Sequence, residues 1–483
     1  MPTVTWLVEF DWANTGAYAA NEAARTVGLR IERGGGGRFD AAPAGKAVIT
    51  LENADRRFDP WYTASPLYPN VMPRRGVRIR AAYSGTTYDI FTGRIEEIEP
   101  STSGGTRRVA VTAYDGLRDL ADAAASVALQ TDVAVDAAVD LVLTDADWPA
   151  GSSYRDLDPS AEVLGYWWRD SEASAKDSLT ELFQAEHGQF FITAAGKARF
   201  LSRMNTTMGE ALATLDEDHI VDIRITTPWE SVINDVRIDC CPVALADLGV
   251  IWTLSDDSFY LSAGAQAELW AEYQDANGRR CAATAVVTPV TVTDFTANTA
   301  ADGSGTNLTA DLTVSAEVYS TWAKLTLENT GSTGFYVTLL QLRGEAIVQT
   351  PMTVRQEDAT SQATYGRRQL RIATPWQQRV EMARDLALGL LNNYSEPLPP
   401  VTVVLRNRLP AMLSYELYDR ITFTAPSYAL QQLMQVSQIT LATGMTMQEL
   451  ELELELEPAE NQVSWLLGVA GKGELGVTTW CGY

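Results

Sequence analysis

Residues 51–98 read LENADRRFDPWYTASPLYPNVMPRRGVRIRAAYSGTTYDIFTGRIEEI, and this is the segment of the chain that discriminates between functions. Prolines in its first part fix φ and push each preceding residue to extended geometry, which predicts an ordered loop. The aromatic, aliphatic and proline side chains of this candidate contact loop are Phe58, Pro60, Trp61, Tyr62, Pro66, Leu67, Tyr68 and Pro69. A loop with this much apolar surface must pack against its own domain or against a neighbouring subunit, and the sequence leaves both alternatives open.

The second part of the stretch predicts a β-hairpin. Val77 and Ile79 alternate with Arg78 and Arg80, and a Ser-Gly pair predicts the turn before a returning strand over residues 88–98. Because side chains alternate between the faces of a strand, one face of this hairpin is apolar and the other is charged. The four arginines at 74, 75, 78 and 80 are the best candidate for a local basic patch.

Length and charge narrow the class of protein. The chain has 483 residues, which at about 100–200 residues per domain predicts three or four domains. Its net charge of −25 opposes attraction to nucleic-acid phosphates or anionic membranes. No apolar run approaches the roughly 20 residues of a membrane span, and no signal-peptide pattern opens the chain. We therefore expect a folded protein that stays in the cytoplasm unless lysis releases it or a particle carries it out.

The order of residues in this stretch resembles the first tube-forming domain of phage tail hub proteins. The residues that carry the resemblance are Leu51, Asn53, Asp55, Arg57, Phe58, Pro60, the SPLYP run at 65–69, Pro73, Arg75, Val77, Arg78, Ile79, Phe91, Gly93 and Ile95. Such hubs lie at the distal end of the tail tube. In that family a trimer carries two similar barrel domains per chain, so that three chains present six domains to a hexameric tube.

The resemblance implies a structural virion component of the tail, assembled in the host cytoplasm. It implies a homotrimer that connects the tail tube or a distal tail ring to tip, spike or fibre proteins, with the tape measure protein as a further candidate partner. DNA would pass through its channel without being specifically bound. The resemblance implies no catalytic activity and no cofactor.

A second barrel is expected near the C-terminus, because residues 418–423, 433–439 and 447–457 repeat the strand order of 77–82, 88–98 and 108–114. The fold class is therefore expected to be mainly β with α+β parts. The expected domains are a first tube-like β-barrel at 1–115, a small α/β domain at 116–215, a second tube-like β-barrel at 216–240 and 346–460 with a helix at 375–394, an inserted β-sandwich at 241–345, and a docking tail at 461–483.

Glutamate and leucine alternate over residues 449–457, which predicts a strand with leucines on one face. The opposite face would carry Glu449, Glu451, Glu453, Glu455 and Glu457. Carboxylates this close need water or cations, and Arg406 and Arg408 are the candidate partners. In a hub this acidic face would either line the lumen of the channel, where it repels DNA phosphates, or lie on the solvated outer surface of the protein.

Catalytic motifs are missing from the sequence. Its two histidines, His187 and His219, do not form an HExxH pair, no GxSxG motif occurs, and the four cysteines include no CxxC. We therefore expect no metal and no disulfide scaffold, and we interpret acidic pairs such as Asp156 and Asp158 as polar turns. The alternative function is a carbohydrate-binding or receptor-binding tail component that acts through the inserted sandwich. Its tryptophans would either bind glycan or fill the core: Trp252, Trp270 and Trp322.

Overall fold

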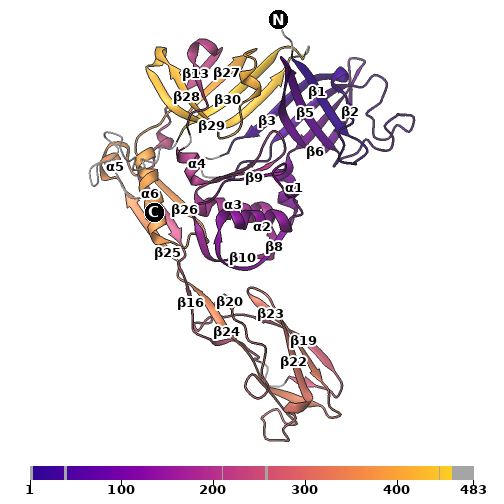
Figure 1. Cartoon of the computed structure of the whole chain (residues 1–483), viewed down its shortest axis with the longest axis vertical. Helices are drawn as coiled ribbons and strands as arrows, with labels where there is room; N and C mark the ends of the chain where they lie inside the picture. Colours follow the sequence, from indigo (N-terminus) through magenta and orange to yellow (C-terminus); the bar gives the residue numbers. More distant parts are fainter. Residues whose placement is uncertain (1–3, 37–40, 209, 256–258, 445–446, 460–483) are drawn as a thin grey trace.

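The largest element of the computed structural model is a 13-stranded sheet that both ends of the chain build (Figure 1). The structure describes residues 4–36, 41–208, 210–255, 259–444 and 447–459. The N-terminal half-sheet consists of β1 (Thr5–Asp11), β2 (Ala20–Asn21), β3 (Thr26–Gly34), β4 (Lys46–Glu52), β5 (Gly76–Tyr83), β6 (Thr86–Ser103) and β7 (Thr106–Tyr114). The C-terminal half-sheet consists of β13 (Ala213–Asp216), β14 (Asp222–Ile225), β27 (Val401–Arg406), β28 (Arg420–Ala425), β29 (Leu430–Thr443) and β30 (Leu450–Pro458).

The two half-sheets join along β3 and β29, which pair antiparallel with Ile31 opposite Leu441. The mainly β fold class is confirmed, but the described strands do not form two separate closed barrels. They follow one path, β14-β27-β30-β29-β3-β4-β7-β6-β5-β1-β2, with β28 and β13 branching from β29. An edge strand presents unpaired N–H and C=O groups, and here each half-sheet satisfies one edge of the other.

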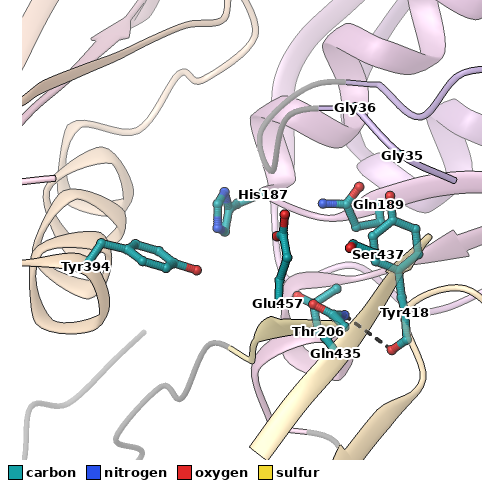
Figure 2. Close-up of a pocket in the computed structure, with 10 residues that line it drawn as sticks. All are labelled: Gly35, Gly36, His187, Gln189, Thr206, Tyr394, Tyr418, Gln435, Ser437 and Glu457. Carbon is teal, nitrogen blue, oxygen red and sulfur yellow. Dashed lines mark hydrogen bonds between the residues drawn. The ribbon is translucent and has the colours of Figure 1, made fainter. Parts of the chain in front are cut away.

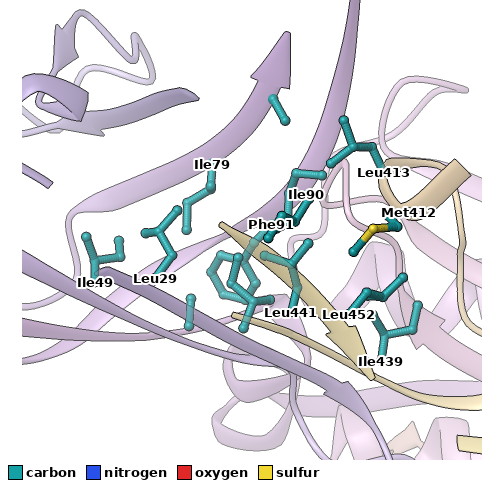
Figure 3. Close-up of a cluster of buried hydrophobic side chains, with 14 of the residues drawn as sticks. Leu29, Ile49, Ile79, Ile90, Phe91, Met412, Leu413, Ile439, Leu441 and Leu452 are labelled. Atoms are coloured by element: carbon teal, nitrogen blue, oxygen red, sulfur yellow. The ribbon is translucent and has the colours of Figure 1, made fainter. Parts of the chain in front are cut away.

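A shared hydrophobic core lies against this sheet. Figure 3 shows Ile79 and Phe91 of the N-terminal half-sheet beside Leu441 and Leu452 of the C-terminal one. Every one of these side chains is almost completely buried. The strand alternation therefore directs apolar side chains from both ends of the chain into one core, which couples the folding of the two half-sheets.

Each half-sheet contains a three-strand antiparallel meander. In the first, β5 pairs with β6 and β6 with β7; in the second, β28 pairs with β29 and β29 with β30. The expected repeat of strand order is therefore present as strand pairing. The leucines of β30 are buried and its glutamates lie on the other face, as the alternation predicts.

An α/β unit follows the first half-sheet. Its elements are α1 (Gly116–Asp122), β8 (Ala124–Ala134), α2 (Val135–Asp145), β9 (Arg155–Leu157), β10 (Val163–Ser174), α3 (Ala175–Glu186), β11 (Gln189–Ile192), β12 (Ala198–Leu201) and α4 (Arg203–Met208). Leu120, Val142 and Phe183 belong to its own core. Asp115 caps its first helix, because the carboxyl group accepts the Leu117 N–H at 3.0 Å and also the Gly45 N–H at 2.8 Å.

The buried Asp115 carboxyl should make stability depend on pH. Burial raises the pKa of Asp115 from 3.8 to about 7. The unfolded chain releases this proton near the ordinary pKa, whereas the folded chain keeps it up to about pH 7. We therefore expect the stability of the wild-type chain relative to Asp115→Asn to fall as pH rises between these two values and to level off above them. Urea denaturation of both chains across this range measures the difference, and a difference that is constant with pH would contradict the buried proton.

A separate small unit occupies part of the segment expected as the second barrel. It contains β15 (Asp235–Cys240), β25 (Met352–Glu357), α5 (Ala359–Tyr365), β26 (Gln369–Ala373) and α6 (Val380–Tyr394). Strand β15 pairs with β25 and β26 in a sheet of three strands, and α6 packs on it in a distinct core with Ile238 and Leu390. Residues 216–240 and 346–460 are therefore divided between this unit and the C-terminal half-sheet.

The longest helix begins at Val380, so the expected start at 375 is wrong. The preceding residues bind the α/β unit instead of forming a first turn. The Trp376 Nε1–H donates to Glu181 at 2.8 Å, and the Gln377 Nε2–H donates to the Ala185 carbonyl at 3.0 Å. These tertiary contacts outweigh the local preference for a helix start.

The inserted sandwich extends away from the 13-stranded sheet beyond β25 and β26 (Figure 1). One layer is organised on the long strand β24 (Phe335–Gln349), with β16 (Val243–Leu245), β17 (Gly249–Thr253), β18 (Tyr260–Leu261), β20 (Ala282–Thr284) and β21 (Phe295–Asn298) paired to it. The other layer contains β22 (Leu312–Val318), β23 (Trp322–Asn329) and β19 (Gln266–Glu272). Among the described residues, no helix is long and apolar enough to cross a membrane.

Candidate functional site

The candidate contact loop connects β4 to β5 as a chain of tight turns. Backbone N–H groups of Arg56, Asp59, Tyr62 and Ser65 each donate to the carbonyl three residues earlier. Asn53 anchors the start of the loop, because its buried side chain accepts the Phe58 N–H at 3.0 Å and donates to Asp59 at 2.6 Å. The loop is therefore ordered by its own hydrogen bonds.

The apolar side chains of this loop divide into two groups. Phe58 is completely buried in the core of the N-terminal half-sheet, and Leu67 packs against that core. Trp61 is 83% exposed and Tyr68 is 46% exposed. The remaining members are intermediate or exposed: Pro60 and Tyr62 are half-buried, whereas Pro66 and Pro69 are exposed. The loop thus packs within its own domain and also presents aromatic side chains outward.

The charge of the candidate basic patch is partly compensated within the chain. Arg78 and Arg80 both bind the Glu9 carboxylate, at 3.0 and 2.8 Å. Burial acts to raise the pKa of Glu9, but the hydrogen bonds from Arg80 and Arg78 hold it below its ordinary value. Arg74 pairs with Asp119 at 2.6 Å, and Arg75 donates to the Asn70 carbonyl. These arginines therefore stabilise the loop and the hairpin, and Glu9 and Asp119 offset part of their charge.

The acidic face lies on β30, between β27 and β29. Arg406 pairs with Glu451 at 2.7 Å as expected, whereas Arg408 donates to the Asp218 carbonyl. Glu453 and Glu457 are half-buried and Glu455 is exposed, and Glu449 is exposed just before the strand begins. Desolvation raises the pKa of Glu455, and the neighbouring Glu453 and Glu457 add to this effect.

The same face of the sheet continues into the N-terminal half-sheet. Glu453 lies opposite Thr440, and Thr440 in turn lies opposite Glu32 of β3. Arg30 pairs with Glu32 at 2.7 Å on this surface. The acidic face is therefore part of a charged surface that crosses the junction of the two half-sheets, which the sequence pattern of one strand does not reveal.

A small polar pocket lies where the half-sheets, the α/β unit and α6 meet (Figure 2). It is lined by Gly35, Gly36, His187, Gln189, Thr206, Tyr394, Tyr418, Gln435, Ser437 and Glu457. His187 reaches it because this residue ends α3 in the left-handed conformation, with φ of 57°. A volume of about 50 Å³ admits a few waters and no organic substrate. Sequence reasoning missed this pocket, because its residues come from distant segments.

A larger groove of about 860 Å³ separates the N-terminal half-sheet from the α/β unit. Arg74, Arg94 and Asp119 line it, and Asp119 binds both arginines, at 2.6 and 3.0 Å. Trp148 and Tyr154 close another side. No sequence pattern predicted this groove, since it forms only when α1 docks beside β6.

In the part of the chain that is described, the acidic pair at 156 and 158 binds an arginine, and the cysteines are free thiols. Asp156 and Asp158 both pair with Arg199, at 3.1 and 2.7 Å. No group of three His, Cys, Asp or Glu side chains among the described residues is placed to hold a metal ion. The described cysteines are buried free thiols, at 240, 241 and 281.

Comparison with known proteins identifies the fold. No protein-family model matches the sequence, and no curated protein matches it. The crystal structure of a tail protein from Neisseria meningitidis superposes with a TM-score of 0.51 over 94% of this chain and 96% of that one, at 10% sequence identity. A 43 kDa tail protein of prophage MuSo2 from Shewanella oneidensis gives a TM-score of 0.49 over 94% and 98% of the two chains, also at 10% identity.

The chain therefore has the fold of a phage tail protein. The superposition covers both half-sheets and the units between them, since it extends over almost the entire length of both chains. The resemblance that residues 51–98 carry is confirmed at the level of the fold.

Proposed function

We propose that this chain is a tail hub, a structural virion component without catalytic activity. It joins the distal end of the tail tube, or a distal tail ring, to tip, spike or fibre proteins, with the tape measure protein as a further partner. The observation that carries the proposal is the pair of three-strand meanders in one sheet. Three copies in a homotrimer would present six meanders, which matches the symmetry of a hexameric tube.

The contact loop would form part of the interface between copies. Exposed Trp61 and Tyr68 stand on a loop whose backbone is held by its own turns, so little conformational freedom would be lost on binding. Large aromatic side chains on a rigid support are typical of residues that dominate protein interfaces. The buried Phe58 side chain supports this role, because it fixes the loop to the core of the N-terminal half-sheet while Trp61 and Tyr68 stay exposed.

The charged surface around β30 would line the channel. Its glutamates and the net charge of −25 would repel DNA phosphates, so that DNA passes without being specifically bound. This arrangement requires the exposed Glu455 to face the lumen. The assembled hub would belong to the virion tail and be built in the host cytoplasm.

Replacing Trp61 by alanine should weaken assembly without unfolding the chain. Because Trp61 is 83% exposed, we expect the free energy of unfolding to change by less than about 0.5 kcal/mol. The loss of a buried aromatic at an interface should raise the dissociation constant of the trimer at least about tenfold. Sedimentation velocity over a dilution series measures the trimer fraction, and urea denaturation measures stability.

Thr63→Ala, an exposed change in the same loop, is the matched control and should alter neither quantity. A wild-type chain that remains monomeric at all concentrations, or a Trp61→Ala chain that trimerises normally, would contradict the role of the loop.

Electron microscopy of particles tests the proposed function itself. A central ring beneath the tube, with β30 toward the lumen, is expected, and a position in peripheral fibres would overturn the hub.

A further inference from the structure

The outer layer of the inserted sandwich has one face in the core and one at the surface. Ala271 of β19 and Leu325 of β23 are completely buried against the other layer. Their neighbours along the strands, Trp270 and Lys324, therefore point to the opposite side. Trp270 is 60% exposed there, which is unusual for the largest apolar side chain.

Three aromatic side chains gather on this outer surface, and we refer to Trp270, Trp322 and Tyr319 as the aromatic patch. The rings of Trp270 and Trp322 lie 4.8 Å apart between centroids. Tyr319, which is 40% exposed, stacks on Trp322 at 3.9 Å with an interplanar angle of 21°. Trp252 is not part of the patch, because it packs against the sandwich core. Mutual packing holds the rings in place, so they form a rigid surface.

Polar groups surround the aromatic patch. The Lys324 ammonium lies 5.9 Å from the centre of the Trp270 ring and pairs with Glu268 at 2.7 Å. The Tyr319 hydroxyl donates to Glu317 at 2.6 Å. Glu272 lies opposite Trp322 in the strand register. Arg280 pairs with Glu272 at 3.7 Å. The apolar surface is thus bordered by two cations and three carboxylates, which offer both donors and acceptors of hydrogen bonds.

From this arrangement we infer that the aromatic patch is a binding site for a neutral oligosaccharide built of pyranose rings with equatorial hydroxyls. Such a ring has an apolar face of C–H bonds, which stacks on an aromatic ring, and an edge of hydroxyls, which bond to carboxylates and an ammonium. A large apolar protein surface would instead remove these charges, including the Lys324–Glu268 pair, from water at a substantial cost. The mixed character of the surface therefore favours a sugar.

Charge decides between neutral and anionic sugars. Around the patch, the three carboxylates of Glu268, Glu272 and Glu317 exceed the two cations, since Lys324 pairs with Glu268 and Arg280 pairs with Glu272 at 3.7 Å. The whole chain adds a net charge of −25. Sialic acids, uronic acids and sugar phosphates would be repelled by this field, whereas a neutral glycan would not.

The position of the patch separates this role from assembly. The layer of β19, β22 and β23 lies at the far end of the molecule from the 13-stranded sheet (Figure 1). The proposed trimer interface and channel lie on the half-sheets, so glycan binding does not depend on the hub function. A chain with no hub role would keep the site, and a hub without the site would still assemble.

Binding of the full-length chain to an array of neutral and anionic oligosaccharides tests the inference, followed by titration with cellohexaose and chitohexaose while tryptophan fluorescence is recorded. We expect at least one neutral pyranose oligosaccharide to bind and its sialylated or uronate counterparts to bind less. Trp270→Ala should weaken that binding at least about tenfold, and Trp270→Phe, which keeps an aromatic face, should weaken it less.

Trp229→Ala is the matched control, because Trp229 is 54% exposed but lies outside the sandwich. It should bind the oligosaccharide like the wild type, and thermal unfolding should show that all variants are folded. Failure of the wild-type chain to bind any neutral oligosaccharide, or equal binding by Trp270→Ala, would overturn the inference. A shift in oligomeric state caused by Trp270→Ala would also overturn it, by identifying the face as a protein contact.

Discussion

Replacing Phe58 by alanine is expected to lower the free energy of unfolding by about 3–5 kcal/mol. The Phe58 side chain is completely buried, with its ring 6.2 Å from that of Trp12, which in turn stacks on Phe10 at 4.6 Å. Alanine would leave a cavity that this ordered loop cannot close, since Asn53 holds the backbone at position 58. The midpoint of urea unfolding, at unchanged slope, measures the loss.

This loss of stability distinguishes the buried Phe58 from the exposed residues of the contact loop, whose replacement should leave the free energy of unfolding almost unchanged. Phe58→Leu keeps most of the apolar volume and should cost less than about 1.5 kcal/mol. If Phe58→Ala unfolds like the wild type but fails to assemble, the residue would belong to the interface between copies and not to the core of its own chain.

Gly93→Ala is expected to destabilise the chain by about 3 kcal/mol, although it adds a single methyl group. A Cβ at this position in β6 would lie 2.1 Å from the carbonyl oxygen of Tyr114 and 2.7 Å from its carbonyl carbon. The obstacle is backbone of β7, which cannot rotate away as a side chain can. Relief of the clash requires β6 and β7 to separate, at the place where β6 also pairs with β5. Calorimetric and urea unfolding of the purified variant measure the effect.

Gly28→Ala in β3 provides the matched control, because its Cβ would meet nothing closer than the Thr50 side chain at 3.8 Å. This change should alter the stability by no more than about 1 kcal/mol. Equal effects of the two substitutions would show that glycine flexibility matters here and that close contact between β6 and β7 does not.

Local patterns determined a large part of the fold. The leucines of residues 449–457 are buried because a strand has a period of two, so that one face collects them whatever the strand pairs with. Prolines likewise predicted an ordered loop before β5. These features depend on residues close together in the chain, whose preferences act before tertiary contacts form.

The acidic face and the aromatic patch show how far such patterns extend toward function. The alternation predicted which face of β30 carries the glutamates, and the tryptophans of the inserted sandwich left glycan binding and core packing as alternatives. The pattern did not show that Arg406 pairs with Glu451 whereas Arg408 donates to the Asp218 carbonyl. Nor did it show that Trp270 and Trp322 meet on the surface while Trp252 packs on the core.

Sequence patterns predicted the hairpin, the buried face of β30 and a resemblance carried by residues 51–98. Tertiary structure alone decided that β3 pairs with β29, that α6 begins at Val380 beside a separate small sheet, and that a pocket and a groove form between units. The physical reason is that periodicity specifies the direction of each side chain. The partner of an unpaired strand edge or an exposed ring depends on segments hundreds of residues away, which only the folded chain brings together.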